Sequence, residues 1–223
     1  MIRTPWTFDE DRCFYSPFPI ANWGPCDVVV EGVADTPRDD FPGTTWGSPI
    51  VSERAAKELG SLCGSMLQFL PLRCFDKLRG VINEKYYLMI VLCKVDCLDF
   101  PRSMRFFGGS WSPRNRVIRP DLIPSGPIVF RVQGLHSFVV VDNVVRQTIL
   151  DKGLTGVHFW EVCQSGDNDA PDEEEVPAEA IDKYRTQWER LPRFHGWASN
   201  NSWHCPVMAR SLGHCASESK FLN

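Results

Sequence analysis

The chain has 223 residues, of which 43% are hydrophobic and 12% aromatic, a composition too apolar for a disordered protein and sufficient for one substantial core. Its formal charge of −4 excludes an overall basic field of the kind that gathers nucleic acid. The longest apolar run, residues 86–93, is far shorter than a membrane helix requires.

Cysteine usage and the first residues indicate a cellular compartment. The nine cysteines are an odd number, and several lie in apolar runs, a pattern typical of reduced and often buried thiols. The first residues turn acidic within ten positions and lack the apolar segment of a signal peptide. We therefore expect a cytoplasmic protein without a disulfide framework.

The N-terminal third predicts a wrapping region followed by a capped helix. Residues 1–50 are rich in Pro, Gly and Trp, with one strand candidate at 27–31. Ser52 can cap a helix, because its hydroxyl can accept a hydrogen bond from a free amide of the first turn. The apolar residues that then recur at helical spacing are Ala55, Ala56, Leu59, Leu62 and Cys63, and Gly60 or Gly64 can end the helix.

Two strands and a long connection follow. Residues 66–72 predict a strand in which Pro71 suggests a strand end or a sheet edge. Residues 86–95 predict a central strand, because the run is apolar on both faces before it alternates. The segment 106–127 is interrupted by glycines and prolines and predicts a long loop or an excursion of short strands, and loops of this length are often functional.

The next elements complete the predicted fold. Residues 127–132 and 137–141 predict a hairpin, Asp142 or Asn143 can cap a second helix, and 156–162 predict a further strand. The elements lack regular βαβ spacing. They therefore predict an α+β fold, with a mostly antiparallel or mixed sheet packed with a few helices in a single main domain with a C-terminal extension.

The acidic residues are concentrated in one segment. Residues 164–180 contain seven acidic side chains and no basic one, which favours a flexible acidic linker. Beyond it, Ile181, Tyr184, Trp188 and Leu191 lie on one face of a predicted helix. We therefore divide the chain into a wrapping region (1–50), a core domain (51–163), an acidic linker (164–180) and a C-terminal helix with an irregular tail (181–223).

The tail holds the one weak candidate for a metal site. His204, Cys205, His214 and Cys215 are four potential zinc ligands within twelve residues. Their adjacent pairs differ from the spaced pairs of ordinary zinc modules, so we favour a free tail and expect neither a metal nor another cofactor.

No motif in the chain supports catalysis. Asp96 and Asp99 follow the predicted central strand and could act as acid and base, although Asp at a strand end more often caps the backbone. The sequence lacks the G-x-S-x-G, Walker and G-x-G-x-x-G motifs. We expect a protein that is not an enzyme, with a small metal- or carboxylate-dependent enzyme as the alternative.

Several tryptophans are candidates for partner binding. Trp46 and Trp111 lie in segments rich in glycine and proline, where an exposed aromatic side chain can anchor a partner. Trp160 lies inside a predicted strand, so we expect it in the core or half-buried.

A family resemblance rests on the order of several segments. These segments are residues 52–59, 67–71, 86–92, 95–99, 128–130, 138–140 and 154–159, together with Leu150. In this order the chain resembles a family of bacterial immunity proteins that are found beside polymorphic toxins, over roughly residues 50 to 163. The resemblance implies a non-enzymatic protein that binds and neutralises a cognate toxin, usually delivered between bacteria by a secretion apparatus, and so protects the producing bacterium.

The resemblance also suggests how a toxin would be bound. The missing signal peptide favours a toxin with a cytosolic target, such as a nuclease or a nucleotide-modifying enzyme. A nuclease cleft is basic, so an acidic cluster could occupy it or steer toward it. The expected toxin contacts are Trp46, Trp111, Arg114, Arg116, Asp172, Glu173, Glu174 and Glu175. We expect no direct contact with nucleic acid or membrane, and an interaction module that does not antagonise a toxin is a further alternative.

Overall fold

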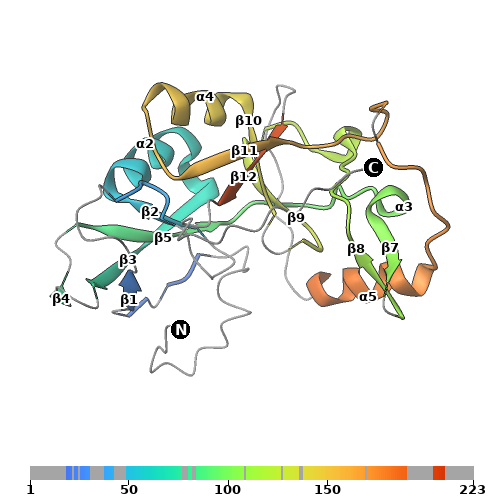
Figure 1. The fold of residues 1–223 in the computed structure, drawn as a ribbon, viewed down its shortest axis with the longest axis horizontal. Coiled ribbons are helices and arrows are strands. Elements are labelled where there is room, and N and C mark those ends of the chain that lie inside the picture. The colour runs from blue at the N-terminus through green and yellow to red at the C-terminus, as the bar shows by residue number, and fades with distance from the viewer. Residues whose placement is uncertain are drawn as a thin grey trace, which may run out of the picture.

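The computed structural model describes residues 19–21, 23–24, 26–30, 38–42, 49–76, 80–81, 84–107, 109–126, 128–135, 138–168, 170–189 and 203–208. Figure 1 shows an elongated arrangement with the first sheet at one end and the helices α3 and α5 at the other. The second sheet lies between these ends.

The first sheet has the strand order β1-β3-β5-β2, and β4 pairs with β3. Its strands are β1 (Asp27–Val30), β2 (Ile50–Ser52), β3 (Leu67–Asp76), β4 (Gly80–Val81) and β5 (Tyr86–Val91). β1 runs parallel to β3, and the other neighbours are antiparallel. In β5, Leu88 and Ile90 face one core whereas Met89 and Val91 face another. This double burial explains the continuous apolar run in the sequence.

Two strand predictions differ from the structure. The strand predicted at 86–95 ends at Val91, because the chain then crosses to the second sheet. Pro71 lies in the middle of β3 rather than at its end. The side of Pro71 that lacks an N–H faces the same way as the amide of Arg73, which donates to Cys26 O, so Pro71 lies just before β1 begins. Its carbonyl accepts a hydrogen bond of 2.8 Å from Trp23 Nε1.

The second sheet has the strand order β11-β12-β10-β9-β6. Its strands are β6 (Lys94–Val95), β9 (Val129–Val132), β10 (Val139–Asp142), β11 (Val157–Glu161) and β12 (Trp203–Met208). β9 and β10 form the predicted hairpin, and β6 runs parallel to β9. β12 lies between β10 and β11 and is antiparallel to both, although the sequence predicted only an irregular tail there.

The helices are α2 (Glu53–Cys63), α3 (Phe100–Ser103), α4 (Asn143–Asp151) and α5 (Ala178–Glu189). Ser52 and Asp142 cap α2 and α4 as predicted, accepting hydrogen bonds of 3.1 and 2.9 Å from the amides of Ala55 and Val145. α2 is followed by Gly64, whose φ of 52° suits glycine. Among the helices in the described ranges, none combines the length and apolar character needed to cross a membrane.

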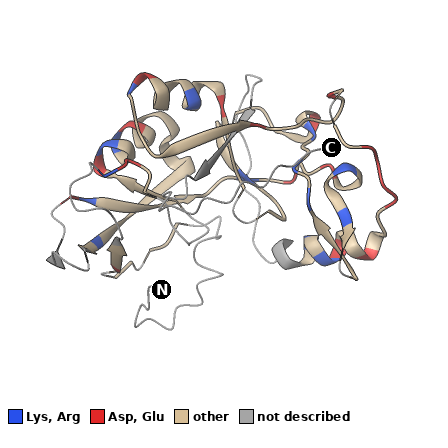
Figure 2. Cartoon of the chain, in the orientation of Figure 1, with Lys and Arg blue, Asp and Glu red and all other residues tan. Residues whose placement is uncertain are grey.

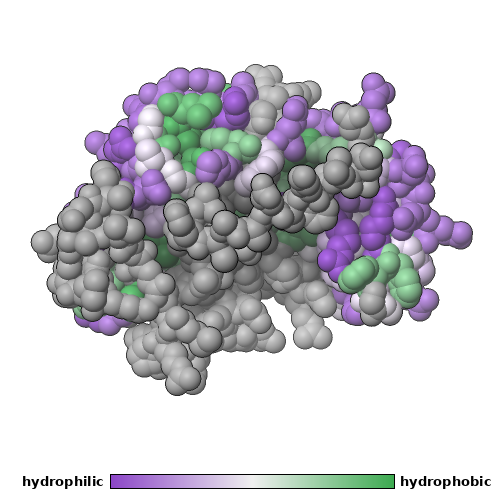
Figure 3. Space-filling view, viewed as in Figure 1, coloured by the Kyte–Doolittle hydropathy of each residue, from purple (hydrophilic) through white to green (hydrophobic). Residues whose placement is uncertain are grey.

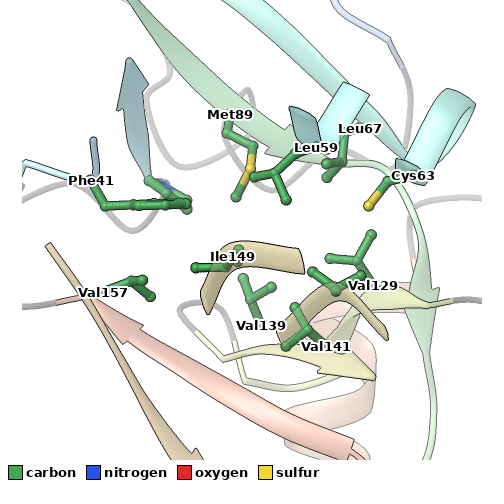
Figure 4. A pocket seen from close by; sticks show the side chains of 12 residues that line it. Phe41, Leu59, Cys63, Leu67, Met89, Val129, Val139, Val141, Ile149 and Val157 are labelled. Carbon is green, nitrogen blue, oxygen red and sulfur yellow. The ribbon is translucent and has the colours of Figure 1, made fainter. Parts of the chain in front are cut away.

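The main core lies where α2 and the first sheet meet α4 and the second sheet. Figure 4 shows its side chains pointing toward one another across this junction. The remaining gap has a volume of about 30 Å³, room for about one water molecule, and its lining is almost wholly apolar. We therefore assign this gap to core packing rather than to ligand binding. The mixed sheets packed with helices confirm the predicted α+β fold.

Candidate functional site: the β7–β8 hairpin

A two-stranded hairpin projects from the end of the molecule that carries α3 and α5 (Figure 1). It consists of β7 (Met104–Phe107) and β8 (Ser110–Pro113), and Phe107 pairs with Ser110 across a two-residue connection. Gly109 in this connection has a φ of 82°, a conformation that glycine adopts without strain. The excursion of short strands predicted for this region is present.

Several hydrogen bonds fix the base and one side of the hairpin. The amides of Arg114 and Asn115 both donate to the carbonyl of Ser103, at 3.0 and 3.1 Å. Asn115 Nδ2 donates to the carbonyl of Arg102 at 3.1 Å. On the side facing α5, the Tyr184 hydroxyl donates to the carbonyl of Trp111 at 2.7 Å. The hairpin is thus held by α3 and α5 before any partner arrives.

The hairpin exposes two phenylalanines and an arginine. Phe106 and Phe107 are 61% and 68% exposed, the highest values among the large apolar side chains of the described residues. The guanidinium of Arg114 lies 4.7 Å from the centroid of the Phe107 ring, and the Phe106 and Trp111 rings are 5.8 Å apart. We call Phe106, Phe107 and Arg114 the hairpin patch. Figure 3 shows an apolar area bordered by hydrophilic residues at this end of the molecule.

The sequence-predicted contact residues occupy different environments. Trp111 is half-buried and packs against the second core, under the hairpin patch. Arg116 is exposed, with its guanidinium 5.1 Å from the Phe138 ring at the edge of the same core. Of the predicted contacts on this hairpin, only Arg114 lies in the hairpin patch. Trp46 lies outside the described residues.

The sequence reasoning missed Phe106 and Phe107. A signal was present, because the two residues directly precede Gly108-Gly109, a typical hairpin connection. Neighbouring residues of a strand point to opposite faces, and an isolated two-stranded hairpin has only one face that can pack on a core. At least one of two adjacent phenylalanines at its tip must therefore be exposed.

The acidic segment packs beside the hairpin. Glu173 pairs with Arg102 at 2.9 Å and Glu174 with Arg105 at 3.1 Å, while the Glu174 amide donates to the carbonyl of Pro101 at 3.0 Å. Asp172 and Glu175 are exposed. Figure 2 shows acidic residues along this connection facing basic residues near the hairpin. Two of the four acidic residues predicted to meet a toxin thus contact this chain itself.

A polar cleft of about 360 Å³ lies between α3 and α5. Asp96 and Asp99 both line it, but Asp99 is buried and caps α3 by accepting a hydrogen bond of 3.2 Å from the Arg102 amide. The side chains of Arg102 and Ser165 also donate to Asp99. Burial raises the pKa of Asp99, but these hydrogen bonds more than offset it and hold the pKa below its usual value. Asp99 is therefore a structural cap, and a poor proton donor or acceptor near neutral pH.

The structure gives no support to the predicted metal ligands. The described residues contain no group of three or more His, Cys, Asp or Glu side chains arranged to hold a metal ion. His204 and Cys205 lie on β12, opposite Glu161 and Trp160 of β11, whereas His214 and Cys215 lie outside the described residues.

A protein-family model matches residues 22–164, which is well over half of the chain. The family is described as an immunity protein family, Imm11. The match begins before residue 50, where the resemblance seen in the sequence starts, and so includes β1 and the segment 38–42. It also includes the β7–β8 hairpin but ends before α5 and β12. No curated protein matches the chain.

Proposed function

Because the chain belongs to the Imm11 immunity protein family, we propose that it binds a cognate protein toxin and neutralises it by covering the toxin's active site. The hairpin patch is the proposed anchor of this contact. The bound toxin would be inactive in the producing bacterium, which is thereby protected from its own toxin and from that of its siblings. This function requires no bond to be made or broken by the immunity protein.

The exposure of Phe106 and Phe107 is the observation that carries the assignment to the hairpin. Soluble proteins seldom leave neighbouring large apolar side chains in water unless they form an interaction site. Aromatic and arginine side chains supply much of the binding energy of protein interfaces, and the hairpin patch combines both. Because the hairpin is already fixed by α3 and α5, binding would lose little conformational entropy there.

The charges near the hairpin patch set what a toxin surface should offer. Arg114 and Arg116 are exposed, so we propose that acidic and apolar groups of the toxin meet them. A nuclease or a nucleotide-modifying enzyme acting in the cytoplasm remains the proposed toxin class. In that case, Asp172 and Glu175 would face the basic rim of its cleft, because Glu173 and Glu174 already pair with Arg102 and Arg105.

Co-expression with the protein encoded by the adjacent gene tests this proposal. The wild-type chain should rescue growth and co-purify with that protein. Replacing Phe107→Ala or Arg114→Ala should each speed dissociation at least about tenfold, equivalent to about 1.4 kcal/mol, and the double variant should lose rescue. The matched control is Leu150→Ala, which removes an exposed apolar side chain of α4 and should bind as the wild type does.

Two results would contradict the proposal at different levels. Folded hairpin variants that dissociate at the wild-type rate would remove the hairpin from the binding surface. If the wild-type chain neither rescues growth nor binds the adjacent gene product, the proposal that this protein is its antagonist fails.

A further inference from the structure

β11 is the outermost strand of the second sheet, and one of its edges is open. All five of its residues pair with β12 on one side, and within the described part of the chain no strand pairs with the other side. Natural proteins usually block such an edge with lysine, proline, a bulge or a very short strand. Val157–Glu161 contains neither lysine nor proline.

An exposed aromatic pair lies on one face of this open strand. Val157 and Phe159 pack against the main core, whereas His158 and Trp160 point to the opposite face of the sheet. Farther along that face, Val162 is buried in the second core, but Trp160 is 50% exposed and His158 is exposed. Their rings are 6.4 Å apart. The open edge is therefore flanked by aromatic surface that the second core does not cover.

We propose that β11 pairs antiparallel with β11 of a second copy of this chain and forms a symmetric dimer. The two-fold axis would pass at Phe159, the middle residue of the strand. In that register His158 of each copy lies directly opposite Trp160 of the other. Residues directly opposite in an antiparallel pair share a face, so the four rings would gather into one cluster.

The sequence of β11 fits itself in this register. Glu161 lies opposite Val157 of the other copy, so the two carboxylates are kept apart and no like charges face each other. A slip by one residue would place the core-facing Phe159 on the same side as Trp160 of its partner, and the faces of the two sheets would no longer be continuous. The self-paired register is thus favoured by both charge and burial.

The other sheet edges are less suited to this role. In the second sheet the opposite edge is β6, with two residues, and in the first sheet β2 has only three. β11 offers five residues and a large exposed side chain, so it can form the longer ladder. The expected contact lies at the small end of protein interfaces, and the dimer should therefore dissociate on dilution.

Salt should affect this dimer differently from a charge-driven complex. Each copy carries a formal charge of −4, and the proposed contact contains no ion pair. Added salt should screen the repulsion between the copies and leave the dimer unchanged or more populated. A complex held by ion pairs would weaken instead.

Sedimentation of the full chain, from about 1 µM to roughly 0.5 mM, tests the proposal in the range where weak interfaces are populated. We expect a monomer at the low end and a dimer at the high end. Trp160→Lys should raise the dissociation constant at least about tenfold, because it places a charge beside the paired edge. The control is Val144→Lys, the same charge change at a similarly exposed residue of α4, which should leave the dimer unaffected.

A chain that stays monomeric throughout, or a dimer that persists with unchanged affinity in folded Trp160→Lys protein, would overturn the proposal. Circular dichroism and the thermal midpoint establish that each variant is folded. The dimer surface is separate from the hairpin patch, so Trp160→Lys should still rescue growth in the co-expression assay. The two proposals can therefore fail independently.

Discussion

At the scale of single residues, Asp40 shows how one buried side chain joins three distant segments. Its carboxylate accepts a hydrogen bond of 2.5 Å from the Ser52 hydroxyl and one of 3.0 Å from the Thr155 amide, and it pairs with Arg54. These partners lie at the start of α2 and just before β11. Asp40 therefore fastens the segment that follows β1 to both of these elements.

The network also shifts the titration of Asp40. Burial alone raises its pKa, but the hydrogen bonds from Arg54, Ser52 and Thr155 have the larger combined effect and lower it from 3.8. Because the folded pKa lies below the unfolded value, Asp40 contributes stability above that value. This contribution is lost as the pH falls through the folded pKa.

We expect Asp40→Asn to lower the free energy of unfolding by about 1–3 kcal/mol near neutral pH, because it weakens several buried hydrogen bonds. Urea titrations at several pH values measure this. The wild type should lose stability below about pH 4, and the variant should lose less. Asp121→Asn, a change at an exposed carboxylate, serves as the control and should cost well under 1 kcal/mol. Equal slopes against pH for wild type and Asp40→Asn would show that Asp40 does not titrate as described.

At the scale of elements, the hairpin divides its aromatic residues into support and contact. Trp111 packs on the second core and its carbonyl binds Tyr184, whereas Phe106 and Phe107 face outward. The ring of Trp111 therefore holds the hairpin in place, and the two phenylalanines are left for a partner.

This division predicts opposite effects of two substitutions. Trp111→Ala should lower the free energy of unfolding by about 1–3 kcal/mol, less than for a fully buried aromatic, because part of the ring is already exposed. Phe107→Ala should change it by less than about 0.5 kcal/mol. Thermal and urea unfolding measure both. If Phe107→Ala proves as destabilising as Trp111→Ala, its ring belongs to the core and the contact role is refuted.

Local signals made some elements predictable and left others hidden. The helix caps at Ser52 and Asp142 follow from a few neighbouring residues, and so does the β9–β10 hairpin. The break after Val91 depends on the position of the second sheet, which no short window of sequence contains. β12 is likewise defined by its neighbours β10 and β11, more than forty residues earlier in the chain.

The candidate site was predictable only in part, for the same reason. Composition placed arginine and aromatic residues in the segment 106–127, and Arg114 is indeed exposed there. The role of Trp111 depends on the second core beneath it, and those core residues come from distant strands. Similarly, a run of acidic residues suggests a free linker, until the folded chain brings Arg102 and Arg105 beside Glu173 and Glu174.

At the scale of the whole molecule, the second sheet joins two cores. The main core covers one face together with α2 and α4, and the second core covers the other with α3 and α5. Ile181 and Tyr184 of α5 pack against the second core, as the helical spacing predicted for that face. The acidic segment leads to α5, and its two ion pairs tie this segment to α3 and β7.

We expect the double variant Glu173→Gln, Glu174→Gln to loosen this end of the molecule without unfolding the rest. Exposed ion pairs contribute about 1 kcal/mol at most, so amide hydrogen exchange in residues 170–189 should speed up by no more than about fivefold. The thermal midpoint should barely change. The control, Asp172→Asn with Glu175→Gln, removes the same charge at neighbouring exposed positions and should leave exchange as it is. Faster exchange spread through both sheets would contradict this local role.

The position of β12 bears on how the protein can be shortened. The region shared with the immunity family stops at residue 164, yet the strand that bridges β10 and β11 begins only at Trp203. A recombinant fragment trimmed to the shared region would have a missing rung in its second sheet and two bare ladders beside the gap. Such fragments should be sticky and poorly soluble, and a useful boundary for crystallisation or binding work lies beyond residue 208.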